Sequence, residues 1–439
     1  MAQTVRRRVW IETYGCQMNK AESEALLLDL RRDGWMEADG PERADVVILN
    51  TCSVRETAEE RIHGRLGFYR KAKRERPFRL VLMGCMAERL KERAVEEYPE
   101  IDVVVGSFQK TLLPGILSRG EGAVAPIVLA GDGNYEFAAM HSAGGIKASI
   151  PIMHGCDNFC SYCIVPVVRG REVSRSPRRI LSEMASIEAQ GTREITLLGQ
   201  NVNSYRYADG GEVVDFPGLL RMAARASKSI HRIRFLTSHP KDLSLSVVRI
   251  MREEPALCAH IHLPVQSGST RILAAMNRHY TADEYMAKVD MIRGQLPETA
   301  LTTDILVGFP GETESDFRDT IAMLEKVGFD DAFLYRYNPR EGTAACTMKD
   351  PVPESVMLDR LSCAIGTQKE IARRMALRRL GRTVEVLVEG PSRRNPEELL
   401  GRTEWDSMAV FSASGARVGE YINVRLESLS GTTFRATPA

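Results

Sequence analysis

The sequence predicts an α/β protein in three parts, and three observations support this fold class. Apolar strands alternate with amphipathic helices first over residues 5–118 and again over residues 142–372. Short strands separated by Gly, Ser and Pro then occupy residues 375–438. We therefore expect an N-terminal open parallel α/β domain, a central partial barrel of six strand–helix units and a small C-terminal β-barrel. A length of 439 residues fits two to three domains.

Composition excludes several classes of protein. The chain has 59 basic and 58 acidic residues, so its net charge of +1 does not attract nucleic acid as a whole. No run of 18 uninterrupted apolar residues is present, so no membrane span is expected. Arg6, Arg7 and Arg8 are not followed by the apolar segment of a secretory signal, and the number of cysteines, nine, is odd. These features favour a reducing, cytoplasmic location.

The first three strands of the N-terminal domain each end beside a cysteine. Strands are expected at residues 9–13, 45–50, 79–83 and 101–105, with helices at 21–33, 55–74 and 88–97. Cys16, Cys52 and Cys85 follow the first three strands. Because parallel strands end along one edge of a sheet, these thiols are expected to meet there. A shared three-thiolate site is favoured over three separate buried cysteines.

Residues 116–146 are rich in Gly and Ala and are expected to form a connector with at most one short strand. In the central part, strands are expected at residues 149–153, 194–198, 232–236, 259–264, 302–307 and 332–335. Ser176-Pro177 predicts a helix start, and Thr281 with Glu284 predicts a capping box. In barrels of this kind, chemistry takes place at the C-terminal ends of the strands.

The first of these strands leads into Cys156, Cys160 and Cys163, a C-x3-C-x2-C triplet. Thiolates at this spacing converge on a metal, and iron–sulfur clusters usually have four cysteine ligands. Three cysteines leave one iron of a 4Fe–4S cluster open to the amine and carboxylate of S-adenosylmethionine. A Cys3His zinc site that includes His154 remains an alternative.

Amide, hydroxyl and glycine residues follow the other five strands, which suits a ligand with carboxylate, ribose and adenine edges. The candidate cofactor-binding residues are Gln200, Asn201, Ser238, Gln266, Ser267, Gly308, Glu312 and Arg336. No catalytic residue beyond the cysteines is identified.

A long arginine-rich helix is expected at residues 355–381, with a solvated face as the simplest interpretation. Its arginines and those that follow it include Arg373, Arg374, Arg378, Arg379 and Arg382. The strands after it, at residues 384–388, 400–403, 409–411 and 421–426, predict a barrel of the oligonucleotide-binding type. Arg393, Arg394 and Arg402 with Trp405 predict an RNA-binding surface that combines charge with stacking.

The chain resembles the radical S-adenosylmethionine methylthiotransferases over its whole length, and within that family the MiaB branch. The Tyr-Gly-Cys-Gln-Met-Asn run at residues 14–19 matches the branch that acts on dimethylallyladenosine. The branches for threonylcarbamoyl-adenosine and for a ribosomal protein tend to read Leu-Gly-Cys-Lys-Val-Asn and Leu-Gly-Cys-Pro-Lys-Asn. The matching stretches are residues 13–19, 50–55, 83–87, 154–166, 169–175, 198–202 and 262–268.

The resemblance implies that residues 5–118 form the methylthiotransferase domain, residues 142–372 the radical core and residues 375–438 a TRAM domain. It also implies two 4Fe–4S clusters. One, on Cys156, Cys160 and Cys163, binds S-adenosylmethionine; the other, on Cys16, Cys52 and Cys85, presents sulfur. The implied reaction adds a methylthio group to C2 of N6-dimethylallyladenosine next to the anticodon of tRNA, with two S-adenosylmethionine molecules per turnover.

The implied partners are the tRNA anticodon stem-loop, an electron donor and a sulfur or cluster supplier, with a monomeric enzyme. Methylthio transfer to threonylcarbamoyl-adenosine or to a ribosomal protein aspartate is the alternative activity, and a non-enzymatic metal-containing RNA-binding module is a third hypothesis. Arginines after the cluster loop are expected to contact phosphate or to be ordinary surface residues: Arg169, Arg171, Arg175, Arg178 and Arg179. Cys258, Cys346 and Cys363 are expected to be structural.

Overall fold

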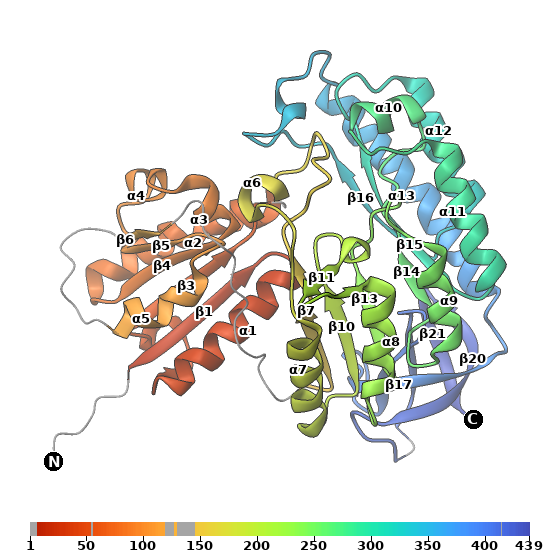
Figure 1. The fold of residues 1–439 in the computed structure, drawn as a ribbon, viewed down its shortest axis with the longest axis horizontal. Coiled ribbons are helices and arrows are strands. Elements are labelled where there is room, and N and C mark those ends of the chain that lie inside the picture. Colours follow the sequence, from red (N-terminus) through yellow and green to blue (C-terminus); the bar gives the residue numbers. More distant parts are fainter. Residues whose placement is uncertain (1–6, 54–55, 119–126, 130–144, 414) are drawn as a thin grey trace.

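A computed structural model describes residues 7–53, 56–118, 127–129, 145–413 and 415–439. The three expected parts follow one another along the chain (Figure 1). In the described ranges, no helix combines the length and apolarity needed to cross a membrane. Of the connector at residues 116–146, one short strand, Ile127–Leu129, is described, while residues 119–126 and 130–144 lie outside the described residues. Val54 and Arg55 of the second matching stretch also lie outside them.

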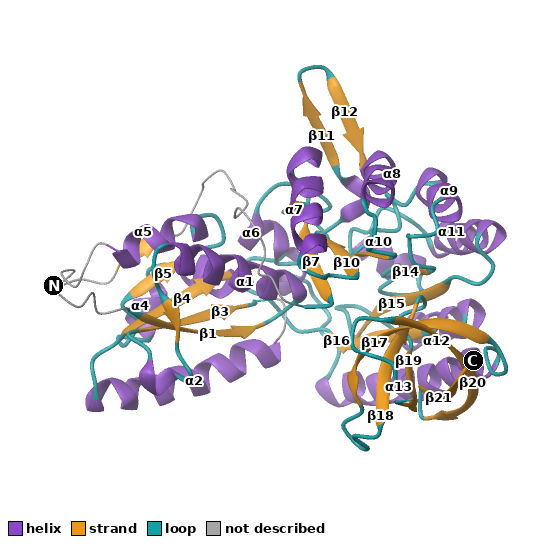
Figure 2. Cartoon of the chain, turned by 90° about the horizontal axis from the view of Figure 1, so that it is seen from below, coloured by secondary structure: helices purple, strands orange, loops and turns teal. Residues whose placement is uncertain are grey.

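The N-terminal part is a six-stranded parallel sheet in the order β2-β1-β3-β4-β5-β6. Its strands are β1 (Arg8–Tyr14), β2 (Met36–Glu37), β3 (Val46–Thr51), β4 (Arg79–Gly84), β5 (Val103–Val105) and β6 (Ile127–Leu129). Its helices are α1 (Gln17–Arg32), α2 (Glu56–Glu75), α3 (Cys85–Leu90), α4 (Arg93–Glu97) and α5 (Leu113–Ser118). Leu26 and Leu30 of α1 pack on one face and Ile62 and Leu66 of α2 on the other (Figure 2), so both faces are covered.

The central part is a partial barrel of two three-stranded parallel sheets, joined by a parallel bridge between Ile233 and Leu257. Its six strands are β7 (Lys147–Pro151), β10 (Glu194–Leu198), β13 (Arg232–Leu236), β14 (His260–His262), β15 (Ala300–Val307) and β16 (Asp331–Arg336). The covering helices are α7 (Pro177–Ala189), α8 (Phe216–Ala226), α9 (Leu245–Glu253), α10 (Thr270–Ala275), α11 (Ala282–Gln295), α12 (Glu314–Val327) and α13 (Glu354–Leu377). Within the described residues, β7 and β16 each pair along one edge only, which leaves the barrel open at its side.

Smaller elements decorate this barrel. The cysteine loop lies between β8 (Met153–His154) and β9 (Val173–Ser174), with α6 (Val165–Arg169) inside the loop segment. A hairpin of β11 (Arg206–Asp209) and β12 (Glu212–Asp215), which the sequence did not predict, projects from the molecule (Figure 2). Single 3-10 turns occur at Pro41–Arg43, Lys110–Leu112, Val202–Ser204 and Ala344–Thr347.

The C-terminal part is a closed barrel in the order β17-β18-β19-β21-β20. Its strands are β17 (Thr383–Pro391), β18 (Glu398–Thr403), β19 (Met408–Ser412), β20 (Tyr421–Ser430) and β21 (Thr433–Pro438). The last strand was missed by the sequence analysis. The predicted helix at residues 88–97 is also corrected, because Lys91 adopts a φ of 52° that ends α3 before α4 begins.

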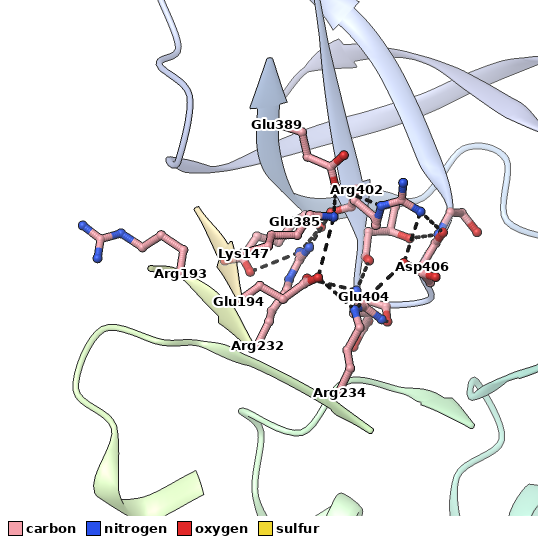
Figure 3. A network of polar contacts seen from close by, with 12 residues as sticks. Lys147, Arg193, Glu194, Arg232, Arg234, Glu385, Glu389, Arg402, Glu404 and Asp406 are labelled. Carbon is pink, nitrogen blue, oxygen red and sulfur yellow. Dashed lines mark hydrogen bonds and ion pairs between the residues drawn. The ribbon is translucent and has the colours of Figure 1, made fainter. Parts of the chain in front are cut away.

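This small barrel covers the N-terminal ends of the central strands through a polar network (Figure 3). Arg234 donates to the main-chain carbonyls of Thr403 and Glu404, both at 2.7 Å. Arg232 donates to the carbonyls of Arg402 and Glu385, and Lys147 pairs with Glu389. Because one end of the partial barrel is closed in this way, a substrate has to approach from the C-terminal end or from the open side.

Candidate metal centres at the junction of two domains

The loop that carries Cys156, Cys160 and Cys163 is held tightly against its own return segment. Gly155 has a φ of 79°, and a Cβ atom there would lie 2.0 Å from the carbonyl oxygen of Arg171, so only glycine fits. The Cys156 amide donates to the Gly170 carbonyl at 3.1 Å, and the Cys163 amide donates to the Cys160 carbonyl at 3.0 Å. All three thiols are free.

Burial dominates the acidity of this trio, which we call the loop trio. Burial first, and then the neighbouring Cys160, raises the pKa of Cys163 to about 12. Burial likewise raises the pKa of Cys156 to about 11. Thiolates are therefore unfavourable here until a cation compensates them, as a bound iron cluster would.

The buried guanidinium of Arg278, in the segment after α10, contacts the loop trio. Arg278 Nη1 lies 3.4 Å from Cys160 Sγ, and its other nitrogens donate to the Pro264 carbonyl at 2.7 Å and to Tyr280 Oη at 3.0 Å. His239 Nε2 lies 4.0 Å from the same sulfur. Burial, followed by the charge of Arg278, lowers the pKa of His239 to about 2, so the imidazole is neutral.

Cys156 has its own polar neighbours. Asn158 Nδ2 approaches Cys156 Sγ at 3.6 Å, and Lys241 Nζ donates to Asn158 Oδ1 at 2.7 Å. Lys241 thus fixes the amide whose nitrogen faces the sulfur, which orients a donor toward a cluster ligand.

Cys16, Cys52 and Cys85, which we call the sheet trio, follow β1, β3 and β4. The chain adds β2 on one side of β1 and β3 on the other, so the strand order reverses between β1 and β3, at the switch point where such parallel sheets bind ligands. A Cβ atom on Gly15 would lie 2.6 Å from Cys52 Cβ, so the strand ends approach closely. A hydrogen bond from Cys52, with a further contribution from the charge of Arg169, lowers the pKa of Cys16 to about 5.

The sheet trio lies beside a buried charge cluster that joins two domains. Arg169, at the end of α6, donates to Glu22 Oε1 at 2.8 Å and Oε2 at 3.3 Å, and Lys110 pairs with Glu22 at 2.5 Å. Burial acts to raise the pKa of Glu22, but Arg169 and Lys110 hold it below its ordinary value. Two cations against one carboxylate leave a net positive charge, which interacts with Cys16 and Cys85.

Apolar contacts bring the two trios to one junction. Ile164 and Val168, directly after the loop trio, pack against Cys85. Met18 and Ala21 of α1 pack with Leu198 at the end of β10, and Cys16 lies against this group. The C-terminal edges of the sheet and of the partial barrel therefore face each other across an apolar contact.

The described ranges contain no site for a single metal ion, because no three Cys, His, Asp or Glu side chains there are arranged to hold one. Cys16 and Cys52 are close enough to share a hydrogen bond. His154, the proposed fourth zinc ligand, instead lies 3.3 Å from Arg169 Nη1, and burial followed by that charge lowers its pKa.

The predicted cofactor residues divide into two groups. Buried polar atoms at the ends of β10 and β13 have no hydrogen-bond partner within the described structure: Gln200 Oε1, Asn203 Oδ1, Asn203 Nδ2 and Ser238 Oγ. Such atoms are costly unless a ligand satisfies them, which fits the polar groups of S-adenosylmethionine. Asn203 was not among the predicted residues, although it lies in the same loop.

The second group is bonded within the protein. Asn201 donates to Asp242 and accepts from the His239 amide, and Ser267 Oγ lies 3.3 Å from Thr320 Oγ1. Gln266 has a φ of 73° and bridges to Ile305 through its main chain. Glu312 pairs with Arg360 at 2.7 Å and accepts from the Gly308 amide, and Arg336 pairs with Glu354. These side chains shape the rim.

Several sequence predictions for surface residues were wrong. Arg169 and Arg175 are 3% and 5% exposed and pair with Glu22 and Glu183, so they do not face phosphate. Trp405 is 5% exposed, with Arg379 4.3 Å from its ring, and so offers no stacking surface.

The remaining surface predictions have mixed outcomes. Arg402 pairs with Glu389 at 2.8 Å, whereas Arg171, Arg178, Arg179, Arg393 and Arg394 are exposed. Cys258 is buried, whereas Cys346 and Cys363 are exposed.

Glu22, Lys110 and Arg278 were missed altogether. Glu22 and Arg169 are 147 residues apart in sequence, and Arg278 and Cys160 are 118 apart. Local sequence patterns cannot predict contacts between residues that are so far apart in the sequence. The only available signal was Arg278 itself, 12 residues after the predicted cofactor residue Gln266, and single arginines are usually surface residues.

Comparison with known proteins accounts for the three parts. Residues 8–106 match uncharacterized protein family UPF0004, residues 150–324 match the radical SAM superfamily and residues 377–438 match the TRAM domain. Among solved structures, the radical S-adenosylmethionine methyltransferase TsrM from Kitasatospora setae has a TM-score of 0.57 at 15% identity, covering 78% of this chain and 74% of its own. The cobalamin-dependent radical enzyme OxsB has a TM-score of 0.53 at 11% identity, covering 83% and 56%. These similarities support the fold.

Proteins of similar length to this chain have a higher sequence identity to it. The tRNA-2-methylthio-N(6)-dimethylallyladenosine synthase of Treponema denticola is 44% identical over 97% of this chain and 99% of its own. The enzyme of the same name from Bacteroides fragilis is 43% identical over 98% and 95%. Membership of the radical SAM superfamily implies S-adenosylmethionine and one 4Fe–4S cluster. The chain belongs to the tRNA-2-methylthio-N(6)-dimethylallyladenosine synthase family of radical S-adenosylmethionine methylthiotransferases.

Proposed function

We propose that this chain transfers a methylthio group to C2 of N6-dimethylallyladenosine beside the anticodon of tRNA. It uses two S-adenosylmethionine molecules per turnover and two 4Fe–4S clusters, one on each cysteine trio. The observation that carries the proposal is the junction itself, where Ile164 and Val168 link the loop trio to Cys85 of the sheet trio. The names and full-length similarity of the relatives support the substrate.

On the radical side, Cys156, Cys160 and Cys163 would hold one cluster, and Gln200, Asn203 and Ser238 would hold S-adenosylmethionine. When bound, these groups supply a carbon radical strong enough to remove hydrogen from an unactivated C–H bond. Arg278 and Asn158 place donors at the sulfurs of Cys160 and Cys156, which favours added negative charge on the cluster. Neutral His239 adds no second charge there.

On the sulfur side, Cys16, Cys52 and Cys85 would hold the second cluster. Arg169 and Lys110 offset the thiolate charge, while Glu22 holds both cations in place. Leu198 and Met18 exclude water from the contact between the two sites. Close approach of two reacting centres in a dry site removes much of the entropic part of a barrier.

The small barrel, with Arg393 and Arg394 exposed on the loop between β17 and β18, is proposed to contact the tRNA anticodon stem-loop. An electron donor and a sulfur or cluster supplier complete the cycle, and we propose a monomeric, cytoplasmic enzyme. The domain limits implied by the family, residues 5–118, 142–372 and 375–438, remain part of this proposal.

The test is an anaerobic assay of the reconstituted full chain with reductant, S-adenosylmethionine and one of three substrates. The substrates are anticodon stem-loops with dimethylallyladenosine or threonylcarbamoyl-adenosine, and a ribosomal peptide with the target aspartate. Mass spectrometry should find the methylthio product on the first alone. Product only on either of the others would reassign the branch.

A further inference from the structure

The segment that follows β16 joins the radical core to the N-terminal part at a second place besides the buried charge cluster. We call residues 340–347 the strap. Arg340 Nη1 lies 3.1 Å from Glu59 Oε2 on α2, and Glu341 Oε2 lies 3.2 Å from Arg93 Nη1 on α4. The strap leaves the last strand of the partial barrel and is therefore paired by its side chains with two helices of the other domain.

The strap is also bonded to the segment that carries the loop trio. The Ala345 amide donates to the carbonyl of Ser161, which lies between the second and third cysteines of the trio, at 2.7 Å. Gly342 has a φ of 87°, and a Cβ atom there would lie 4.0 Å from Ile164 and from Val167, which follow the trio. A displacement of the strap would therefore be felt at the loop trio.

Glu59, the partner of the strap, is bonded in turn to residues beside the sheet trio. Arg89 Nη2 donates to Glu59 Oε1 at 3.0 Å, and Arg89 Nε donates to Ser53 Oγ at 3.4 Å. Ser53 directly follows Cys52, and Arg89 lies one helical turn after Cys85 in α3. One carboxylate oxygen of Glu59 thus faces the sheet trio, while the other faces the strap.

The contacts of Glu59 differ in kind from the apolar contacts at the junction. Ile164 and Val168 pack against Cys85, but apolar contacts are not directional, so they hold the two domains together without fixing their orientation. Charge-assisted hydrogen bonds do fix direction. Glu59 and Arg340 are only 14% and 13% exposed, so water and salt screen their interaction only in part.

We propose that Glu59 is a positioning residue, which holds the loop trio and the sheet trio in the alignment that methylthio transfer requires. It acts through Arg89 on the side of the sheet trio and through Arg340 and the strap on the side of the loop trio. Loss of its carboxylate leaves each trio intact but frees one to shift against the other. The inference rests on the proposed function and assigns the residue that couples its two centres.

The test compares Glu59→Gln with the wild type in the anaerobically reconstituted full chain, given S-adenosylmethionine, reductant and a dimethylallylated anticodon stem-loop. The variant should keep most of its formation of 5′-deoxyadenosine, the product of S-adenosylmethionine cleavage. It should lose methylthio product by roughly tenfold or more, because a small misplacement of reacting groups is costly. Chromatography of one reaction gives the ratio of the two products, which should rise accordingly. Glu59→Asp, which keeps the carboxylate, should restore much of the wild-type ratio.

Hydrogen–deuterium exchange of the metal-free full chain tests the same link without clusters. In Glu59→Gln, peptides that contain the strap and α6 should exchange faster than in the wild type, because their local opening becomes easier. Glu253→Gln is the matched control, since it removes an exposed pair with Arg221, at 2.8 Å, inside the radical core. It should leave both the product ratio and the exchange of the strap as in the wild type.

A wild-type product ratio in Glu59→Gln, or wild-type exchange of its strap, would overturn the inference. Equal loss of 5′-deoxyadenosine and methylthio product would also overturn it, because that result indicates general destabilisation rather than misalignment. A wild type that forms no methylthio product would count against the proposed function itself, and the exchange comparison would then decide the role of Glu59 on its own.

Discussion

Cys156, Cys160 and Cys163 come from one loop of eight residues, whereas Cys16, Cys52 and Cys85 come from three strand ends that only the sheet brings together. Their surroundings differ as well. Burial raises the pKa of Cys163 to about 12, while the contact with Cys52 lowers that of Cys16 to about 5. In the loop trio, the short sequence separation holds the three cysteines together, whereas in the sheet trio the order of the parallel strands does so. The comparison teaches that two sets of three cysteines can have different charge environments, which suits them to different chemical roles.

The largest expected effect separates the two tasks. Cys160→Ala should abolish S-adenosylmethionine cleavage, because the loop trio loses an obligatory ligand. Cys52→Ala should leave cleavage measurable as 5′-deoxyadenosine but abolish the methylthio product. Chromatography of both products in one anaerobic assay measures this, with exposed Cys363→Ala as the control. Equal loss of both activities in the two variants would mean that the sites do not act separately.

The buried charge cluster at the sheet trio gives the next largest effect. Glu22→Gln leaves Arg169 and Lys110 without their carboxylate, which should destabilise the domain junction by about 3–5 kcal/mol. Glu37→Gln removes an exposed pair with Arg31 and should cost about 0–1 kcal/mol. Urea unfolding followed by fluorescence compares the two. Similar midpoints for both variants would show that the cluster does not hold the domains together.

The acidity of the thiols allows the loop trio and the sheet trio to be compared in the metal-free protein. Cys16 and Cys156 are both half-buried, but their pKa values are about 5 and about 11. At pH 7 Cys16 is a thiolate and Cys156 a thiol, so Cys16 should react with iodoacetamide about tenfold faster, once its lower nucleophilicity is included. The Cys16 rate should fall as the pH falls through 5. Peptide mass spectrometry after timed alkylation gives both rates, and a faster Cys156 would reverse the electrostatic assignment.

The smallest effect concerns Arg278. Replacing the guanidinium with a neutral amide in Arg278→Gln removes a positive charge 3.4 Å from Cys160 Sγ. A reduced cluster is then less stabilised, and its potential should become more negative, by on the order of tens of millivolts. Potentiometric titration followed by electron paramagnetic resonance measures the shift, with Arg178→Gln on the exposed face of α7 as the control. An unchanged potential would leave Arg278 with a purely structural role.

The sequence predicted the strands of the partial barrel to within a few residues because their apolar runs and Gly-rich ends are local signals. It also predicted that Cys16, Cys52 and Cys85 share an edge, since parallel strands require this. It did not predict the lid formed by the small barrel, because Arg232 and Arg234 resemble surface residues until Thr403 and Glu404 cover them.

Burial of single side chains was the main source of error. Trp405 was expected to stack with RNA, but it packs with Ala300 and Ala376 where the small barrel meets the central part. Arg169 was expected to contact phosphate or to be an ordinary surface residue, but it is buried and its partner Glu22 lies in another domain. Contacts between distant parts of the chain depend on how the folded domains pack against one another. The spacing of residues in the sequence does not predict that packing.

Iron content tests the central comparison most directly. Anaerobically reconstituted wild type should bind about eight irons, as two 4Fe–4S clusters require. The triple variant Cys156→Ala/Cys160→Ala/Cys163→Ala should retain about four, with the spectrum of a 4Fe–4S cluster on Cys16, Cys52 and Cys85. A triple variant without iron, or a wild type with only four, would contradict the assignment of two separate centres.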